Sequence, residues 1–104
     1  MAMDFITYDT RKNMLCSLPI SYSFHKSIFY GPDSMKLNNE SYPHLFKLRH
    51  YHGHSVEYFS SDIACLIKEL KNYCRYIHGH QQKAALLMDK MSDPLVWKVE
   101  FTGD

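Results

Sequence analysis

Histidine is the residue type most able to do chemistry in this sequence, because seven of its 104 residues are histidines. Two pairs flank a glycine in His-Gly-His triplets. Alternate residues of a strand share one face, so His50, His52 and His54 would converge on an ion such as Zn²⁺ if the strand were regular. Gly53 argues against that regularity, and no HExxH or CxxC pattern accompanies the histidines. We keep these three histidines as candidate metal ligands, but expect solvated or core-edge histidines.

Catalysis by histidine is a second possibility. His50 and His54 with Lys47 would suit metal-independent RNA cleavage, in which histidine acts as a general acid or base. The His-x-Ser motif of the two-histidine phosphoesterases occurs only once, starting at His25, and nothing near Cys16 in the sequence would activate its thiol. Only 4 glycines are present, and no phosphate-binding glycine motif is found. We expect no catalytic residue and no cofactor.

A basic stripe is predicted on the most strongly periodic segment of the chain. At about 100° per residue, its four basic side chains fall within roughly 80° of one another on a helical wheel. Such a stripe would dock phosphates or an acidic protein surface, whereas the simpler interpretation is the solvated side of an amphipathic helix. The stripe consists of Lys68, Lys71, Arg75 and His78, with Tyr76 alongside.

Aromatic residues are numerous, with 8 tyrosines and 6 phenylalanines. Exposed rings would form a stacking platform for nucleic-acid bases. At strand spacing, however, aromatic rings more often pack in the core, and this is what we expect. The residues concerned are Tyr8, Tyr22, Phe24, Phe29, Tyr30, Tyr51, Tyr58 and Trp97.

Composition limits the class of protein. Lys and Arg number 12 against 11 Asp and Glu, a net charge of +1 that does not fit a dedicated nucleic-acid binder. The longest apolar run, residues 84–88, is far shorter than the roughly 20 residues that a membrane span needs. The first residues include an acid and no signal-peptide-like apolar run. We therefore expect a cytoplasmic protein without membrane association, whose three cysteines are reduced and lie in or near the core.

The elements that must position these residues follow from periodicity. Alternating apolar residues predict strands at residues 3–8, 20–24 and 95–101. A hairpin is expected from residues 45–51 and 55–59, with its turn near Gly53.

Two helices are expected in the second half of the chain. The longer begins at an N-cap supplied by Ser60 or Ser61, carries Asp62 in its first turn, and ends near Gly79. The shorter covers residues 81–91 and stops before Pro94. The apolar stripe of the longer helix is Ile63, Leu66, Ile67, Leu70, Cys74 and Ile77.

Segregated strands and helices predict an α+β fold, an antiparallel sheet of about four to five strands covered by one long amphipathic helix and one shorter helix. The length fits a single globular domain over residues 1–104. We interpret the chain as a small non-catalytic binding protein, an immunity or inhibitor type that neutralises a toxin or enzyme by protein contact. A basic nuclease as target would require an acidic patch, around Asp33, Glu40 or Glu57. The alternatives are a histidine-dependent nuclease or metal hydrolase, and a nucleic-acid-binding regulator that uses the basic stripe; the oligomeric state stays open.

Overall fold

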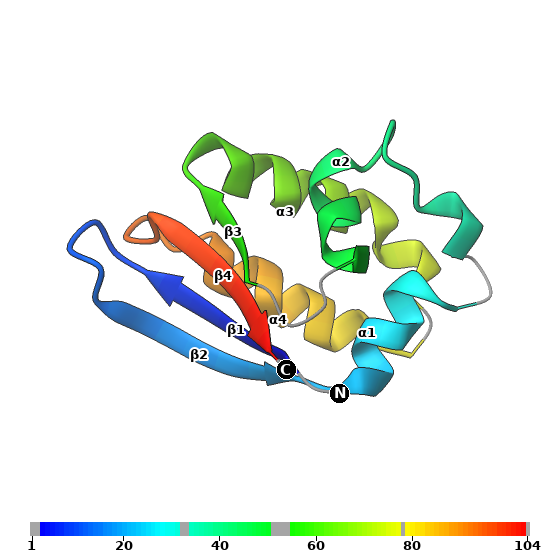
Figure 1. Ribbon diagram of the computed structural model, residues 1–104, viewed down its shortest axis with the longest axis horizontal. Coiled ribbons are helices and arrows are strands. Elements are labelled where there is room, and N and C mark those ends of the chain that lie inside the picture. Colours follow the sequence, from blue (N-terminus) through cyan, green and yellow to red (C-terminus); the bar gives the residue numbers. More distant parts are fainter. Residues whose placement is uncertain (1–2, 32–33, 51–54, 78, 104) are drawn as a thin grey trace.

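The computed structural model describes residues 3–31, 34–50, 55–77 and 79–103. Within these residues, four strands form one antiparallel sheet in the order β2-β1-β4-β3 (Figure 1). The predicted α+β class with an antiparallel sheet is confirmed. The strands are β1 Met3–Tyr8, β2 Met14–Ile20, β3 Val56–Phe59 and β4 Lys98–Gly103.

A tight turn joins β1 to β2. The carboxylate of Asp9 accepts hydrogen bonds from the backbone N–H groups of Arg11 and Asn13, each at 2.9 Å. These bonds, above all the one from Asn13, hold the pKa of Asp9 below its ordinary value. Lys12 follows in the left-handed region with φ 66°, at a place in a hairpin loop that glycine suits best. The strand at residues 3–8 is confirmed, and a second strand that the sequence did not reveal returns antiparallel beside it.

The strand expected at residues 20–24 is wrong, because Tyr22–Phe29 form helix α1. Ser21 is the N-cap, and its hydroxyl accepts a hydrogen bond from the Phe24 N–H at 3.2 Å. Phe24 and Ile28 lie one helical turn apart and are both buried. The spacing of four residues, which a helix needs, therefore prevails over the spacing of two that suggested a strand.

The predicted hairpin is wrong in its first half. Instead of a strand at residues 45–51, the chain forms helix α2, Pro43–Phe46, and then a 3₁₀ helix η2, Lys47–His50. Pro43 takes the first helical position, where its missing N–H has no intrahelical partner to lose. The second half is confirmed as β3, whereas the turn near Gly53 lies outside the described residues.

The long helix begins at the expected place. Ser60 stands at the N-cap of α3, but its φ is 47° and its side chain makes no capping bond; Asp62 lies in the first turn as predicted. The helix tightens into a 3₁₀ turn before Gly79, which is left-handed with φ 79° and precedes α4. No helix of the described residues is long and apolar enough to cross a membrane. The remaining helices are α3 Ser61–Tyr73, η3 Cys74–Tyr76, α4 Gln81–Met91 and η1 Ser34–Lys36.

The cysteines carry free thiols, and all three lie among the described residues. Cys16 on β2 and Cys74 in η3 are half-buried, whereas Cys65 is exposed on α3. The prediction that all three lie in or near the core is therefore wrong for Cys65, which falls outside the apolar stripe of its helix.

Burial alternates along the strands, so one face of the sheet meets the helices and the other faces solvent. On β1, Met3, Phe5 and Thr7 are buried while Asp4 is exposed; on β4, Val99 is buried while its neighbours Lys98 and Glu100 are only partly covered. We call the solvent side the open face. It carries Asp4, Ile6 and Tyr8 from β1, Ser17 and Pro19 from β2, Glu57 and Phe59 from β3, and Lys98, Glu100 and Thr102 from β4.

Candidate functional site

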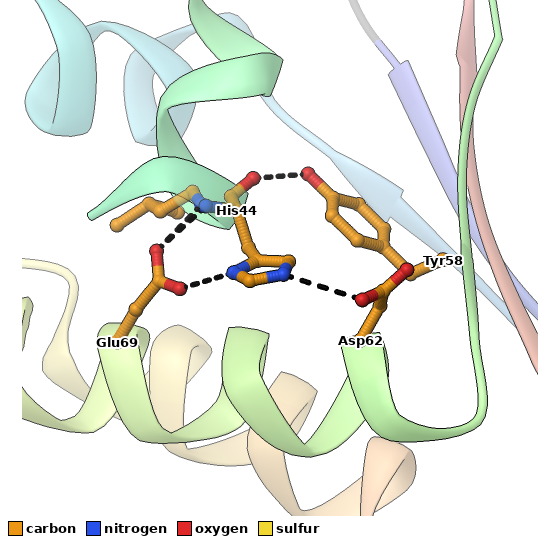
Figure 2. Close-up of polar contacts among 5 residues, drawn as sticks. His44, Tyr58, Asp62 and Glu69 are labelled. Atoms are coloured by element: carbon orange, nitrogen blue, oxygen red, sulfur yellow. Dashed lines mark hydrogen bonds and ion pairs between the residues drawn. The ribbon is translucent and has the colours of Figure 1, made fainter. Parts of the chain in front are cut away.

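A partly buried cluster joins His44 to two carboxylates of α3 (Figure 2). Glu69 is only 8% exposed, and its Oε2 lies 2.5 Å from Nδ1 of His44. Its Oε1 accepts hydrogen bonds from the backbone N–H groups of His44 and Leu45, at 2.8 and 3.0 Å. On the other side of the imidazole, Nε2 lies 3.3 Å from Oδ1 of Asp62.

The position of Glu69 explains why α2 forms where the sequence suggested a strand. The first N–H groups of a helix have no intrahelical partner. In α2 two of them are satisfied by a carboxylate that comes from α3, 25 and 24 residues away in the sequence. Glu69 thus acts as an N-cap supplied from another helix, and its negative charge suits the helix dipole.

Tyr58 of β3 completes the cluster. Its hydroxyl donates a hydrogen bond to the carbonyl oxygen of His44 at 2.5 Å (Figure 2). Burial raises the pKa of Tyr58 far above its ordinary value, and the charges of Glu69 and Asp62 raise it further. The phenol is therefore neutral at physiological pH and works as a hydrogen-bond donor.

These contacts indicate a structural role for the cluster. A general base needs a ring nitrogen directed at the proton that it will take, but both nitrogens of His44 face carboxylate oxygens. The hydroxyl of Tyr58 is bonded to the backbone. The cluster ties α2, α3 and β3 together.

The structure describes only part of the predicted metal site, so that site stays a prediction. The backbone of His50 ends η2, so the strand alternation that would have placed it beside the next two histidines does not hold there. His52, His54 and the side chain of His50 lie outside the described residues. Among those described, no three His, Cys, Asp or Glu side chains are placed to hold a metal ion.

Two members of the predicted basic stripe lie together on one surface of the protein. Lys68 and Lys71 are exposed on the side of α3 away from the core, and His78 is outside the described residues. Because the chain tightens to a 3₁₀ turn after α3, Arg75 does not continue the helical wheel of the two lysines. Its guanidinium lies 5.0 Å from the ring centroid of the half-buried Tyr76. The role of the stripe in partner binding stays a prediction.

A different site emerges where three separate parts of the chain meet at one end of the open face. Here a surface pocket of about 320 Å³ is lined by two lysines and three aromatic rings, a size in the range of ligand pockets. We call it the aromatic–lysine pocket. Its lining residues are Tyr8 at the end of β1, Lys12 in the following turn, Phe59 at the end of β3, Trp97 just before β4, and Lys98 at the start of β4.

The rings of this pocket hold one another and Lys98 in place. Phe59, 39% exposed, packs edge-to-face on Trp97 with 5.1 Å between ring centroids. The Lys98 ammonium lies 4.9 Å from the centroid of Tyr8. It also contacts Oε2 of Glu57 at 2.7 Å, a hydrogen bond that raises the pKa of Lys98 above its ordinary value.

The sequence prediction did not select this pocket. Tyr8 and Trp97 were expected as packing residues, and Phe59 was not singled out. The sequence does contain part of the signal for an exposed ring. Tyr58 and Phe59 are adjacent on a strand and must face opposite sides of the sheet. Which of the two faces solvent depends on the core, and the meeting of Phe59 with Trp97 depends on strand pairing.

No family model, no curated protein and no solved structure matches this chain.

Proposed function

We propose that this chain is a small non-catalytic binding protein, of inhibitor or immunity type, that neutralises a toxin or enzyme by covering it with the open face of its sheet. The observation that carries the proposal is the exposed aromatic–lysine pocket at one end of that face. Tyrosine and tryptophan are the side chains that most often dominate the energy of protein interfaces. A cytosolic setting, in which the free thiols stay reduced, suits the proposal.

Contact through the face is favoured over pairing at the edges of the sheet. The edge strand β2 contains Pro19, and its pairing with β1 is interrupted by a bulge near Tyr8. The other edge, β3, has only four residues and includes Glu57. Proline, bulges, short length and charge are the features that discourage a further strand from pairing at an edge.

The open face also carries carboxylates, although that of Glu57 is paired with Lys98. Glu57, expected in an acidic patch, lies opposite Glu100 of β4 in the sheet register, and Asp4 is exposed on β1. Asp33 lies outside the described residues, and Glu40 is exposed far from these strands in the sequence. Charges of both signs on one face favour a specific partner and a defined orientation.

The histidine-dependent alternative gains no support from the described residues. The imidazole of His44 is engaged on both sides, and its carboxylate partner Glu69 caps a helix. The role that these contacts support is structural.

The proposal is tested by photo-crosslinking followed by affinity measurement. A benzoylphenylalanine introduced at Phe59 should trap a protein from the native lysate, and one introduced at the 92% exposed Met35 should not. With the purified partner, Phe59→Ala should weaken binding by about tenfold or more. Leu86→Ala is the matched control, because Leu86 of α4 has nearly the same exposure, 37%.

An inhibitor must also act on its target. Addition of one equivalent of the wild-type chain should suppress the partner's enzymatic or toxic activity. A partner that binds Phe59→Ala as tightly as wild type, or that is lost on nuclease treatment, would contradict the proposal. The second result would favour a nucleic-acid binder that uses Lys68 and Lys71.

A further inference from the structure

We infer that the aromatic–lysine pocket receives an acidic side chain of the protein partner, set beside an apolar or aromatic group, and that Lys12 is the cation that selects it. This inference rests on the proposed function and names the chemistry of the partner at its anchor point. The inference is supported by the position and the ion pair of Lys98, by the ammonium of Lys12, which is unpaired among the described residues, by the backbone conformation of Lys12, and by the apolar rings of the pocket.

The pocket does not suit a cationic group, although three aromatic rings often hold one. The cation position is already filled by Lys98, whose ammonium lies 4.9 Å from the centroid of Tyr8 and 6.0 Å from that of Phe59. An arriving lysine or arginine would find the faces of these rings already occupied by an ammonium group.

The charge of Lys98 is largely balanced within the fold, because its ammonium is in contact with Glu57 at 2.7 Å. Lys12 is different. Among the described residues its ammonium has no ion pair and no side-chain hydrogen bond; only its backbone N–H bonds, to the carbonyl of Asp9. Lys12 therefore supplies the unbalanced positive charge at the wall of the pocket.

The backbone conformation of Lys12 supports the same inference. With φ 66° it lies in the left-handed region, which a residue with a Cβ adopts at a cost in conformational energy that glycine avoids. Folding alone would thus favour glycine in this turn. The chain nevertheless places a lysine at this position, and its side chain lies at the wall of the pocket.

The rings provide the other half of the recognition. Phe59 and Trp97 offer an apolar surface beside the two ammonium groups. A partner segment that carries a carboxylate next to an apolar or aromatic group would place the carboxylate against Lys12 and the apolar group against Phe59. A lone carboxylate in water would gain only the weak attraction of an exposed ion pair.

The test uses three acetylated and amidated dipeptides, Phe-Asp, Phe-Asn and Phe-Lys, which differ in charge but share one ring. They are titrated into the isotope-labelled full chain, and binding is followed by the NMR signal of the Trp97 indole N–H. Phe-Asp should bind most tightly and Phe-Lys most weakly. Lys12→Gln should weaken Phe-Asp about threefold or more and leave Phe-Asn unchanged.

Arg11→Gln is the matched control, because it removes one positive charge from the same exposed turn but not from the pocket. It should leave all three affinities unchanged. Equal binding of the three dipeptides, the absence of any Trp97 shift, or an equal effect of Arg11→Gln would overturn the inference. Adenosine monophosphate is titrated in parallel, and tighter binding of it than of Phe-Asp would also overturn the inference, since the pocket would then belong to a free nucleotide.

The two proposals fail in different ways. The proposed function fails if the purified partner binds Phe59→Ala as well as wild type. The present inference fails alone if that partner still depends on Phe59 but is insensitive to Lys12→Gln and the dipeptides show no charge preference.

Discussion

Tyr58 illustrates how one buried polar atom links the fold to pH. Its ring is fully buried, and its hydroxyl donates to the carbonyl oxygen of His44. Burial first, and then Glu69 and Asp62, raise the pKa of the phenol in the folded protein. In the unfolded chain the same phenol loses its proton near pH 10.

We predict that Tyr58 makes the protein less stable as the pH rises above about 10, because the unfolded state then releases a proton that the folded state keeps. Tyr58→Phe should flatten this decline, by at most about 1.4 kcal/mol per pH unit. At neutral pH it should lower the free energy of unfolding by about 1–2 kcal/mol, since the carbonyl of His44 loses its donor. Urea unfolding measured from neutral to alkaline pH checks both effects.

Tyr22→Phe is the control for this prediction, because Tyr22 is 49% exposed. It should change neither the stability at neutral pH nor its alkaline decline. If Tyr58→Phe kept the alkaline slope of the wild type, the buried phenol would not be its source.

At the scale of elements, the short helix α2 depends on the long helix α3. A helix of four residues is too short to be stable by itself, and its first N–H groups are satisfied by Glu69. The other oxygen of this buried carboxylate contacts Nδ1 of the His44 imidazole. Each element therefore completes the hydrogen bonding of the other.

We predict that Glu69→Ala lowers the free energy of unfolding by about 3 kcal/mol or more, because it leaves buried N–H groups and the imidazole without their acceptor. Glu69→Gln should cost less, about 1–2 kcal/mol, because its amide oxygen still accepts the two backbone bonds. Denaturant unfolding gives these values. Amide hydrogen exchange at His44 and Leu45 should accelerate more in Glu69→Ala than in Glu69→Gln.

Glu40→Gln serves as the reference, because Glu40 is exposed and its replacement should change the stability by less than about 0.5 kcal/mol. A Glu69→Ala variant as stable as Glu40→Gln would show that the cap is dispensable.

At the scale of the whole molecule, the first and last strands of the described chain, β1 and β4, pair with each other at the centre of the sheet. β1 pairs with β4 from Met3 opposite Gly103 to Tyr8 opposite Lys98, so the start of β1 lies beside the end of β4 (Figure 1). The outer strands β2 and β3 each have one partner strand among the described residues. The inner face of the central pair is buried under the helices.

We predict a gradient of local stability across this sheet. Amides bonded between β1 and β4 should exchange with solvent most slowly, near the rate set by global unfolding, because exposing them breaks the core. Amides of the short edge strand β3 should exchange faster. Native-state hydrogen exchange measures this order, and equal protection of β3 and of the β1–β4 pair would contradict it.

Sequence alone determined the elements whose signals are local. The α+β class, the strand at residues 3–8 and the bounds of α4 at Gln81–Met91 follow from periodicity and from turn-forming residues near the ends. The burial of Ile63, Leu66 and Leu70 on one side of α3 was predicted for the same reason. Such patterns repeat within one or two helical turns, so no distant contact is needed to read them.

Tertiary structure decided everything that depends on residues far apart in the sequence. The apolar residues near Phe24 fit a strand or a helix, and the core selected the helix. α2 has its cap on another helix, at Glu69. The aromatic–lysine pocket joins residues near positions 8–12, 59 and 97–98, which no local spacing connects. Its existence follows from strand order, because only the pairing of β4 with both β1 and β3 brings these side chains together.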